Sequence, residues 1–143
     1  VKELKKRNSL PIYLVGFSRG SVDAASFAKK YPDAIKGIVL ASGVYTNSSK
    51  KAESYSMESI IGTKIEVNTL VAHHKKDTCQ VTKFKFARRF YDNLQAPVKE
   101  IILFDGGTPT GGRCGPLHHH GYEGIESEAA NKISEWLLLD AKN

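Results

Sequence analysis

The chain has 143 residues, a length that predicts one domain over residues 1–143, and its 41% apolar and 25% charged residues are those of an ordinary globular protein. The net charge of +6 comes from small basic groups spread along the chain, without the single basic face that nucleic-acid binding needs, so no nucleic-acid partner is expected. Every apolar run is shorter than the roughly 20 residues that span a bilayer, and residues 1–10 lack the apolar stretch of a signal peptide, so no membrane partner is expected.

Strand and helix patterns alternate along the chain. The predicted elements are, in order, the tail of a helix at 1–8, a strand at 12–17, a helix at 18–30, a strand at 34–41, a loop at 42–59, a strand at 67–73, a helix at 81–94, a strand at 98–104, a loop rich in Gly and Pro at 105–121 and a helix at 122–139. The strands are predicted from short, continuously apolar runs, which are typical of strands buried on both faces of a parallel sheet. The helices are predicted from apolar residues three and four positions apart. This alternation predicts an α/β fold in which a parallel sheet is flanked by helices.

The strongest chemical signal is the pentapeptide Gly16-Phe17-Ser18-Arg19-Gly20, which matches the pattern G-x-S-x-G. It lies between a predicted strand and a predicted helix, where the pattern places a serine nucleophile on a sharp, strained turn. Gly16 and Gly20 are expected to avoid the collisions that side chains would cause beside such a turn. The helix that begins at Arg19 would direct free backbone N–H groups toward the serine, so we expect the Arg19 N–H to be an oxyanion donor. A glycine-rich turn with an incidental serine is the alternative.

A serine nucleophile needs a base and an acid that orients the base, and in this pattern they follow in the order Ser, Asp or Glu, His. Asp77 follows the predicted strand at 67–73, and Asp105 directly follows the strand at 98–104. Either residue could instead be a turn residue that caps the local backbone. We favour Asp77 for its place in the order, and because Asp105 precedes two glycines, which is typical of a turn.

The base is expected in the loop at 105–121, which holds consecutive histidines at positions 118, 119 and 120. A metal site that combines them with His73 and His74 is the competing interpretation. Adjacent histidines rarely point at one ion, and neither a His-x₃-His spacing nor a carboxylate pattern accompanies them, so no metal is expected. Without a metal, His73 and His74 would mark the end of a strand, with one ring packed and the other exposed.

With these motifs, the chain resembles the serine hydrolases of the α/β-hydrolase superfamily, in the branch of esterase-like and dienelactone-hydrolase-like domains. The likeness extends over the whole chain, but it corresponds only to the C-terminal half of the family's fold, so the domain is expected to be partial. The segments that carry it are 16–20 for the nucleophile, 71–79 for the acid and 106–122 for the histidine. The resemblance implies no cofactor. It implies that the catalytic residues are Ser18, Asp77 and His120, the last because it directly precedes a glycine and an aromatic residue.

The resemblance also implies a disulfide between Cys79 and Cys114, because similar bacterial proteins have one cysteine two residues after the acid and another in the histidine loop. Such a bridge would hold the acid and the base in register and would stabilise the fold by roughly 3–4 kcal/mol. It would also indicate an oxidising compartment, periplasmic or extracellular. Two reduced, partly buried thiols are the alternative.

Compared with the family, the chain is expected to lack the first strands of the sheet and their loops. One of those loops normally supplies the second oxyanion N–H, and the loss of one such donor typically lowers the rate by about 10²–10³-fold. An exposed sheet edge invites pairing, so we expect either a homo-oligomer or a separate N-terminal segment to complete the sheet. The short connection at 42–59 implies a pocket without a large helical lid, open to small-molecule acyl substrates.

The function expected from these features is that of a serine hydrolase, which cleaves an ester, thioester or similar acyl bond through an acyl-enzyme. One alternative is a non-catalytic binding or partner module that needs the absent N-terminal segment. The other is a metal-binding protein built on the histidines, which metal analysis of the purified protein would distinguish from the first two.

Overall fold

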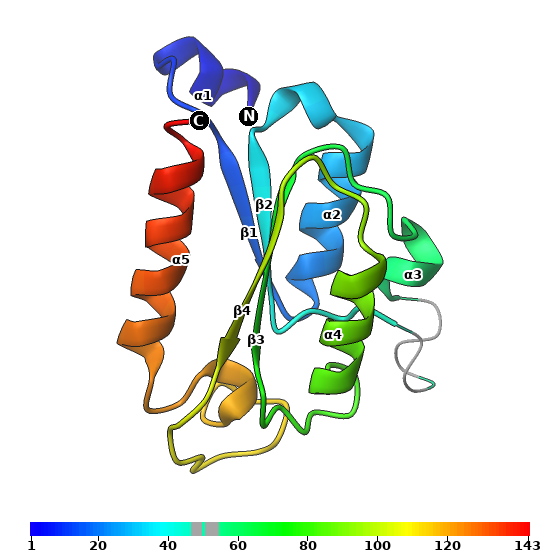
Figure 1. The fold of residues 1–143 in the computed structure, drawn as a ribbon, viewed down its shortest axis with the longest axis vertical. Coiled ribbons are helices and arrows are strands. Elements are labelled where there is room, and N and C mark those ends of the chain that lie inside the picture. The colour runs from blue at the N-terminus through cyan, green and yellow to red at the C-terminus, as the bar shows by residue number, and fades with distance from the viewer. Residues whose placement is uncertain (47–49, 51–54) are drawn as a thin grey trace.

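The computed structural model describes residues 1–46, 50 and 55–143. Its sheet has four parallel strands in the order β1-β2-β3-β4, so each strand pairs with the next one along the chain. The strands are β1 (Tyr13–Phe17), β2 (Gly37–Ala41), β3 (Asn68–His74) and β4 (Lys99–Phe104). The helices are α1 (Lys2–Arg7), α2 (Gly20–Lys30), α3 (Met57–Ile60), α4 (Phe84–Asn93) and α5 (Glu126–Asp140), with 3₁₀ turns η1 (Pro32–Ala34) and η2 (His119–Gly121). The predicted α/β class is therefore confirmed (Figure 1).

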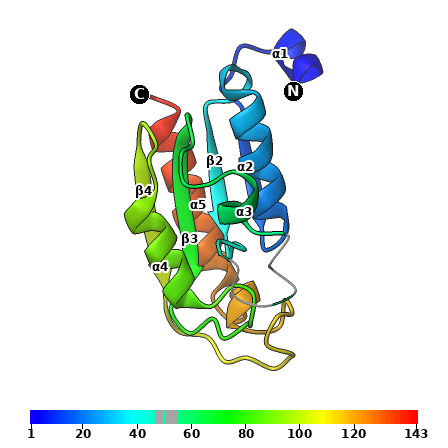
Figure 2. The ribbon, with the colours of Figure 1, turned by 90° about the vertical axis from the view of Figure 1, so that its right-hand side faces the viewer.

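Helices cover both faces of the sheet, with α2, α3 and α4 on one side and α5 on the other (Figures 1 and 2). Side chains alternate across a strand, so each strand contributes to two cores. In β2, Ile38 and Leu40 pack in the core beneath α2 and α4, whereas Val39 and Ala41 pack in the core beneath α5. All residues of β2 are buried, as predicted for a strand covered on both faces.

Strand β1 is less buried than predicted. Val15 is 57% exposed and Phe17 is 43% exposed, so the prediction of burial on both faces is wrong for this strand. Both residues share a face with Tyr13, whose ring packs against Trp136 of α5. Because β1 is an edge strand of the described sheet, α5 covers its beginning and leaves its end open.

Several element boundaries differ from the predicted ones for local reasons. Helix α3 lies partly within the predicted loop 42–59, because Ser56 and Ser59 form a capping box that starts it. Positions 47–49 and 51–54 of that loop lie outside the described residues. Helix α5 begins later than predicted, because Tyr122 and Gly124 adopt left-handed backbone conformations that a helix excludes.

The strands place the predicted motifs at one end of the sheet. Ser18 follows β1, Asp77 follows β3, and His120 lies in the loop between β4 and α5. Parallel strands end at the same edge of a sheet, and ligands bind outside these carboxyl ends in open α/β sheets. Among the described helices, none combines the length and the apolar character needed to cross a bilayer.

Candidate active site

Ser18 lies on the turn between β1 and α2. Its φ of 52° is in the left-handed region, which residues other than glycine rarely adopt. The Ser18 N–H donates to Ala41 O at 2.8 Å, and the Ser21 hydroxyl donates to Ser18 O at 2.6 Å, so neighbouring segments hold this conformation in place. A strained backbone that its surroundings enforce is typical of a functional residue.

Gly16 is required by this turn, whereas the described surroundings leave room at Gly20. A Cβ atom on Gly16 would lie 2.4 Å from Gly20 O and 2.6 Å from the Ser21 Cα, both of them backbone atoms. A Cβ atom on Gly20 would meet no described atom within 4 Å. The expected collision is therefore present at Gly16, and the expectation is wrong for Gly20. The reason is that Gly16 faces the first turn of α2, whereas Gly20 lies on the open side of that turn.

Gly16→Ala is expected to lower the free energy of unfolding by about 1–3 kcal/mol, because the added methyl group meets backbone rather than a movable side chain. Gly20→Ala is expected to leave that free energy unchanged, or to raise it by up to about 1 kcal/mol, because alanine restricts the unfolded chain. Urea denaturation monitored by circular dichroism compares the two variants. Equal destabilisation by both substitutions would contradict this description of the turn.

A chain of hydrogen bonds joins Ser18, His120 and Asp77. Ser18 Oγ lies 3.0 Å from His120 Nε2, and His120 Nδ1 lies 3.0 Å from Asp77 Oδ2. His120 and Asp77 are buried, at 2% and 4% exposure, whereas Ser18 is partly exposed. The three side chains predicted from the sequence thus lie in the order Ser18, His120, Asp77, with Ser18 on the solvent side.

Donors surround the Asp77 carboxylate. Its Oδ1 accepts a hydrogen bond from the Cys79 N–H at 2.8 Å, and its Oδ2 accepts one from the Thr82 hydroxyl at 2.9 Å. His73 Nε2 also lies 3.3 Å from Oδ2. Burial raises the pKa of Asp77, but the contacts with His120 and His73 outweigh burial and hold the pKa well below its usual range. Asp77 is therefore ionised at neutral pH and is able to stabilise an imidazolium.

Sequence reasoning missed two hydroxyl residues that position the histidine. Thr82 Oγ1 lies 3.0 Å from His120 Nδ1, and the buried Ser42 hydroxyl donates to His120 O at 2.7 Å. Nothing local distinguishes Thr82 from the other serines and threonines of the chain. Ser42 directly follows β2 at the carboxyl edge of the sheet, and this placement was the one signal available for it.

Asp105, the rival acid, is a turn residue. It is half exposed, its Oδ1 accepts a hydrogen bond from the Gly106 N–H at 2.9 Å, and it pairs with Lys76 at 3.1 Å. The hydrogen bond from Lys76 is the main reason that the pKa of Asp105 is lowered. Asp77, rather than Asp105, occupies the position beside His120.

The other histidines of the loop pack against one another. The His119 ring stacks on the His74 ring with a centroid distance of 4.5 Å, and the His118 ring lies edge-on to His119 at 5.1 Å. His74 Nε2 lies 3.0 Å from Gly106 O. Within the described part of the chain, no group of three or more His, Cys, Asp or Glu side chains is arranged to hold a metal ion.

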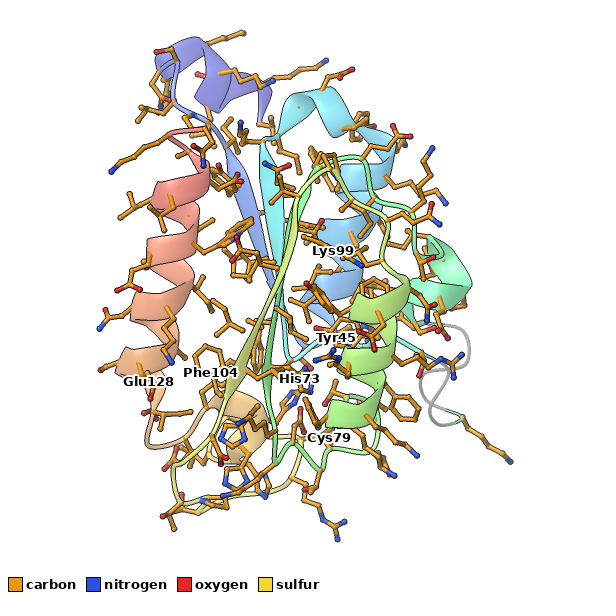
Figure 3. The ribbon with its side chains drawn as sticks, viewed as in Figure 1. Tyr45, His73, Cys79, Lys99, Phe104 and Glu128 are labelled. Carbon is orange, nitrogen blue, oxygen red and sulfur yellow. A yellow bond between two sulfur atoms is a disulfide. The ribbon has the colours of Figure 1, made fainter. Side chains whose placement is uncertain are left out.

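His73 and His74 are both fully buried, so the expectation that one of the two rings would be exposed is wrong. β3 is an interior strand, and the histidine loop folds over its end. His73 faces the core beside Tyr45, on the side of the sheet covered by α4 (Figure 3). The His74 ring instead stacks on the His119 ring.

Cys79 and Cys114 form a disulfide, as the resemblance implied, with their Cα atoms 4.7 Å apart. Cys79 is fully buried, and its backbone N–H holds the Asp77 carboxylate. Cys114 belongs to the loop that carries His120. The bridge therefore ties the loop of Asp77 to the loop of His120.

Arg19 occupies the position expected for an oxyanion donor. Its backbone is already helical, with φ of −58° and ψ of −38°, directly after the left-handed Ser18. Among the backbone hydrogen bonds of the described residues, none uses the Arg19 N–H. An N–H at the start of a helix has no partner within the helix, which accounts for this unused donor next to Ser18.

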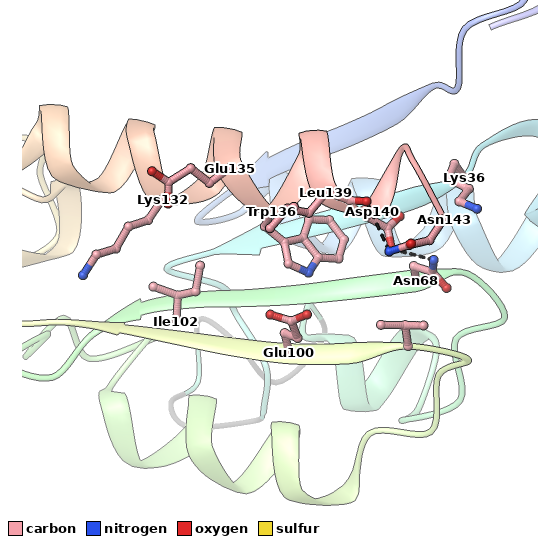
Figure 4. A pocket seen from close by; sticks show the side chains of 11 residues that line it. Lys36, Asn68, Glu100, Ile102, Lys132, Glu135, Trp136, Leu139, Asp140 and Asn143 are labelled. Atoms are coloured by element: carbon pink, nitrogen blue, oxygen red, sulfur yellow. Dashed lines mark hydrogen bonds between the residues drawn. The ribbon is translucent and has the colours of Figure 1, made fainter.

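A large hollow lies elsewhere, between β4 and α5 (Figure 4). Its lining includes Trp136, Asn68 and Asp140. Asp140 accepts hydrogen bonds from the Tyr13 hydroxyl at 2.7 Å and from the Asn68 amide at 2.8 Å. Strand β1 begins at Tyr13 and strand β3 begins at Asn68. The hollow therefore lies at the amino end of these strands and is separate from Ser18.

Comparison with known proteins shows likeness in structure only. No family model matches the sequence, and no curated protein matches it in sequence. A monoacylglycerol lipase from Paleococcus ferrophilus is similar over 97% of this chain and 72% of its own, with 17% identity and a TM-score of 0.68. The esterase PF2001 from Pyrococcus furiosus is similar over 95% of this chain and 57% of its own, with 16% identity and a TM-score of 0.64. A dienelactone hydrolase from Anabaena variabilis is similar over 90% of this chain and 49% of its own, with 16% identity and a TM-score of 0.58.

Proposed function

We propose that this chain, which has the α/β-hydrolase fold, is a serine hydrolase that cleaves an ester, thioester or similar acyl bond. The observation that carries the proposal is the chain of contacts from Ser18 Oγ through His120 to the ionised Asp77, with Ser18 in a left-handed conformation. A hydroxyl is a weak nucleophile unless a base accepts its proton, and this arrangement supplies the base and the group that orients it.

In the proposed reaction, Ser18 Oγ attacks the carbonyl carbon of the substrate while His120 Nε2 accepts the hydroxyl proton. The Arg19 N–H stabilises the oxyanion of the tetrahedral intermediate. His120 then donates the proton to the departing alcohol or thiol, which leaves the acyl group on Ser18. A water molecule releases the acid by the same steps in reverse, with His120 again acting as the base. Asp77 remains ionised throughout and stabilises the imidazolium.

A strand that pairs with β1 is a further part of this proposal. Beside the open edge of β1, the exposed apolar side chains of Val15 and Phe17 project from the face of the sheet that α5 leaves uncovered. The Phe17 ring also lies 5.1 Å from the His120 ring, so a strand paired with β1 would lie close to His120 and Ser18. An apolar strand edge favours pairing, so we propose that a second copy of this chain or a separate segment pairs there and supplies the second oxyanion N–H.

Labelling with a fluorophosphonate probe, followed by peptide mapping, tests the proposed activity. We expect stoichiometric modification of Ser18 in the wild-type protein, and none at that site in Ser18→Ala or His120→Ala. Ser127→Ala, which removes an exposed hydroxyl from α5, is the matched control and should label normally. A folded wild-type protein that stays unmodified would overturn the proposal. Light scattering on the same sample tests the pairing, since a monomer that labels fully needs no second copy.

A further inference from the structure

His73 is a buried imidazole that contacts the acid of the candidate triad from a second direction. Its side chain is fully buried, and its Nε2 lies 3.3 Å from Asp77 Oδ2. The same oxygen lies 3.0 Å from His120 Nδ1 and accepts a hydrogen bond from Thr82. The Asp77 carboxylate therefore lies between His73 and His120, and of these two His120 is the one in contact with Ser18.

Apart from Asp77, the described neighbours of the His73 ring are mainly aromatic side chains. The His73 ring packs between the rings of Tyr45, at a centroid distance of 5.8 Å, and Phe84 of α4, at 6.4 Å. Neither ring nitrogen forms a hydrogen bond with a described residue, and Nε2 approaches Asp77 Oδ2 at 3.3 Å without meeting hydrogen-bond geometry. The Tyr45 hydroxyl donates to Leu40 O instead. Buried polar groups usually have a partner, so an imidazole placed here without one calls for an explanation.

The titratable groups around His73 indicate which contact accounts for a buried imidazole at this position. From the loop after β3, Asp77 approaches Nε2, and its charge is the one in contact with the ring among the described residues. From the segment after β2 comes Tyr45, whose pKa burial raises, so that it stays uncharged. α4 contributes the apolar ring of Phe84. The contact that remains for His73 is the carboxylate that orients His120.

We propose that His73 is a positioning residue for the acyl-transfer reaction, a role that rests on the proposed function. It carries its hydrogen on Nε2, on the side of the ring that lies 3.3 Å from Asp77 Oδ2, and so shares the negative charge of the carboxylate with His120. A carboxylate whose charge is shared among several donors attracts a proton on His120 less strongly. His73 thereby limits how strongly the Asp77 carboxylate acts on His120.

Replacing His73 with a side chain that cannot donate is expected to change the pH dependence of the reaction. In His73→Leu, Asp77 loses its contact with the Nε2 atom, so its charge acts more strongly on His120. The acid limb of the profile of kcat/KM against pH should move up by about 0.5–1 pH unit. The looser carboxylate should also lower kcat by about 10-fold, with KM nearly unchanged. His73→Gln places an amide donor at nearly the same position and should restore the wild-type profile.

The experiment measures the hydrolysis of p-nitrophenyl acetate against pH in the wild type, His73→Leu, His73→Gln and Phe84→Leu, the last as a control for packing around the same ring. Nuclear magnetic resonance follows the titration of the His120 ring in the same proteins and needs no turnover. A His73→Leu profile identical to that of the wild type, or an equal shift in Phe84→Leu, would overturn the proposal.

The ring nitrogens of His73 provide a test in the wild type alone, which holds even if His73→Leu fails to fold. ¹⁵N spectra should show the hydrogen on Nε2, and a hydrogen on Nδ1 alone would overturn the proposal. Failure of the hydrolase function appears differently, as absent labelling at Ser18 in a protein whose His120 and His73 signals still report their contact with Asp77.

Discussion

Asp77→Asn is expected to lower kcat by about 10³–10⁴-fold, while Asp105→Asn leaves kcat within about twofold of the wild type. An amide at position 77 presents neutral atoms to His120 Nδ1, so it cannot stabilise the imidazolium and no longer selects the ring tautomer that accepts the serine proton. Asp105 contacts Lys76 and the Gly106 N–H rather than the histidine, so its replacement should alter only the turn. Steady-state hydrolysis of p-nitrophenyl acetate by the three proteins measures the difference.

A second measurement on the same variants separates the chemical role from a structural one. The pKa of Asp77 is lowered in the folded state, so its ionised form stabilises the fold above the pKa of the unfolded chain, and this contribution is lost as the pH falls. Urea denaturation at several acidic pH values should therefore show a weaker pH dependence in Asp77→Asn than in the wild type. Equal losses of kcat in Asp77→Asn and Asp105→Asn would contradict the assignment of the acid.

Removing the disulfide is expected to have the largest effect on stability. The double variant Cys79→Ala and Cys114→Ala should lose roughly 3–4 kcal/mol of the free energy of unfolding, because the cysteines are 35 residues apart in sequence and the bridge restricts the unfolded chain. This double variant keeps the backbone N–H at position 79 that bonds to Asp77 Oδ1, so the effect reports the bridge rather than a lost hydrogen bond. Urea denaturation of both proteins measures it.

The wild type treated with a reductant should approach the stability of the double variant, and the reductant should leave the double variant unchanged. We also expect a lower kcat without the bridge, because the loop of His120 is then tied to the loop of Asp77 by side-chain contacts alone. A bridge-free protein with the unfolding midpoint of the wild type would contradict both expectations.

The sequence alone was sufficient for the parallel α/β architecture and for the place of the turn that carries Ser18. A strand buried on both faces needs an uninterrupted apolar run, and β2 has one, so its pattern was sufficient to identify it. G-x-S-x-G is likewise a local pattern, since Gly16 leaves the room that the turn at Ser18 needs. The resemblance that these motifs suggested is confirmed at the level of the fold by structural neighbours that share only 16–17% of its residues.

What only the tertiary structure decided depends on contacts between distant residues. Ser18 and His120 are 102 positions apart, and Asp77 and His120 are 43 apart, so no local pattern could say which histidine and which aspartate meet. The same holds for Thr82 and His73, whose neighbours exist only once β3, α4 and the histidine loop have packed together. The exposure of β1 is also a property of the sheet, because an apolar strand is buried only when another element lies beside it.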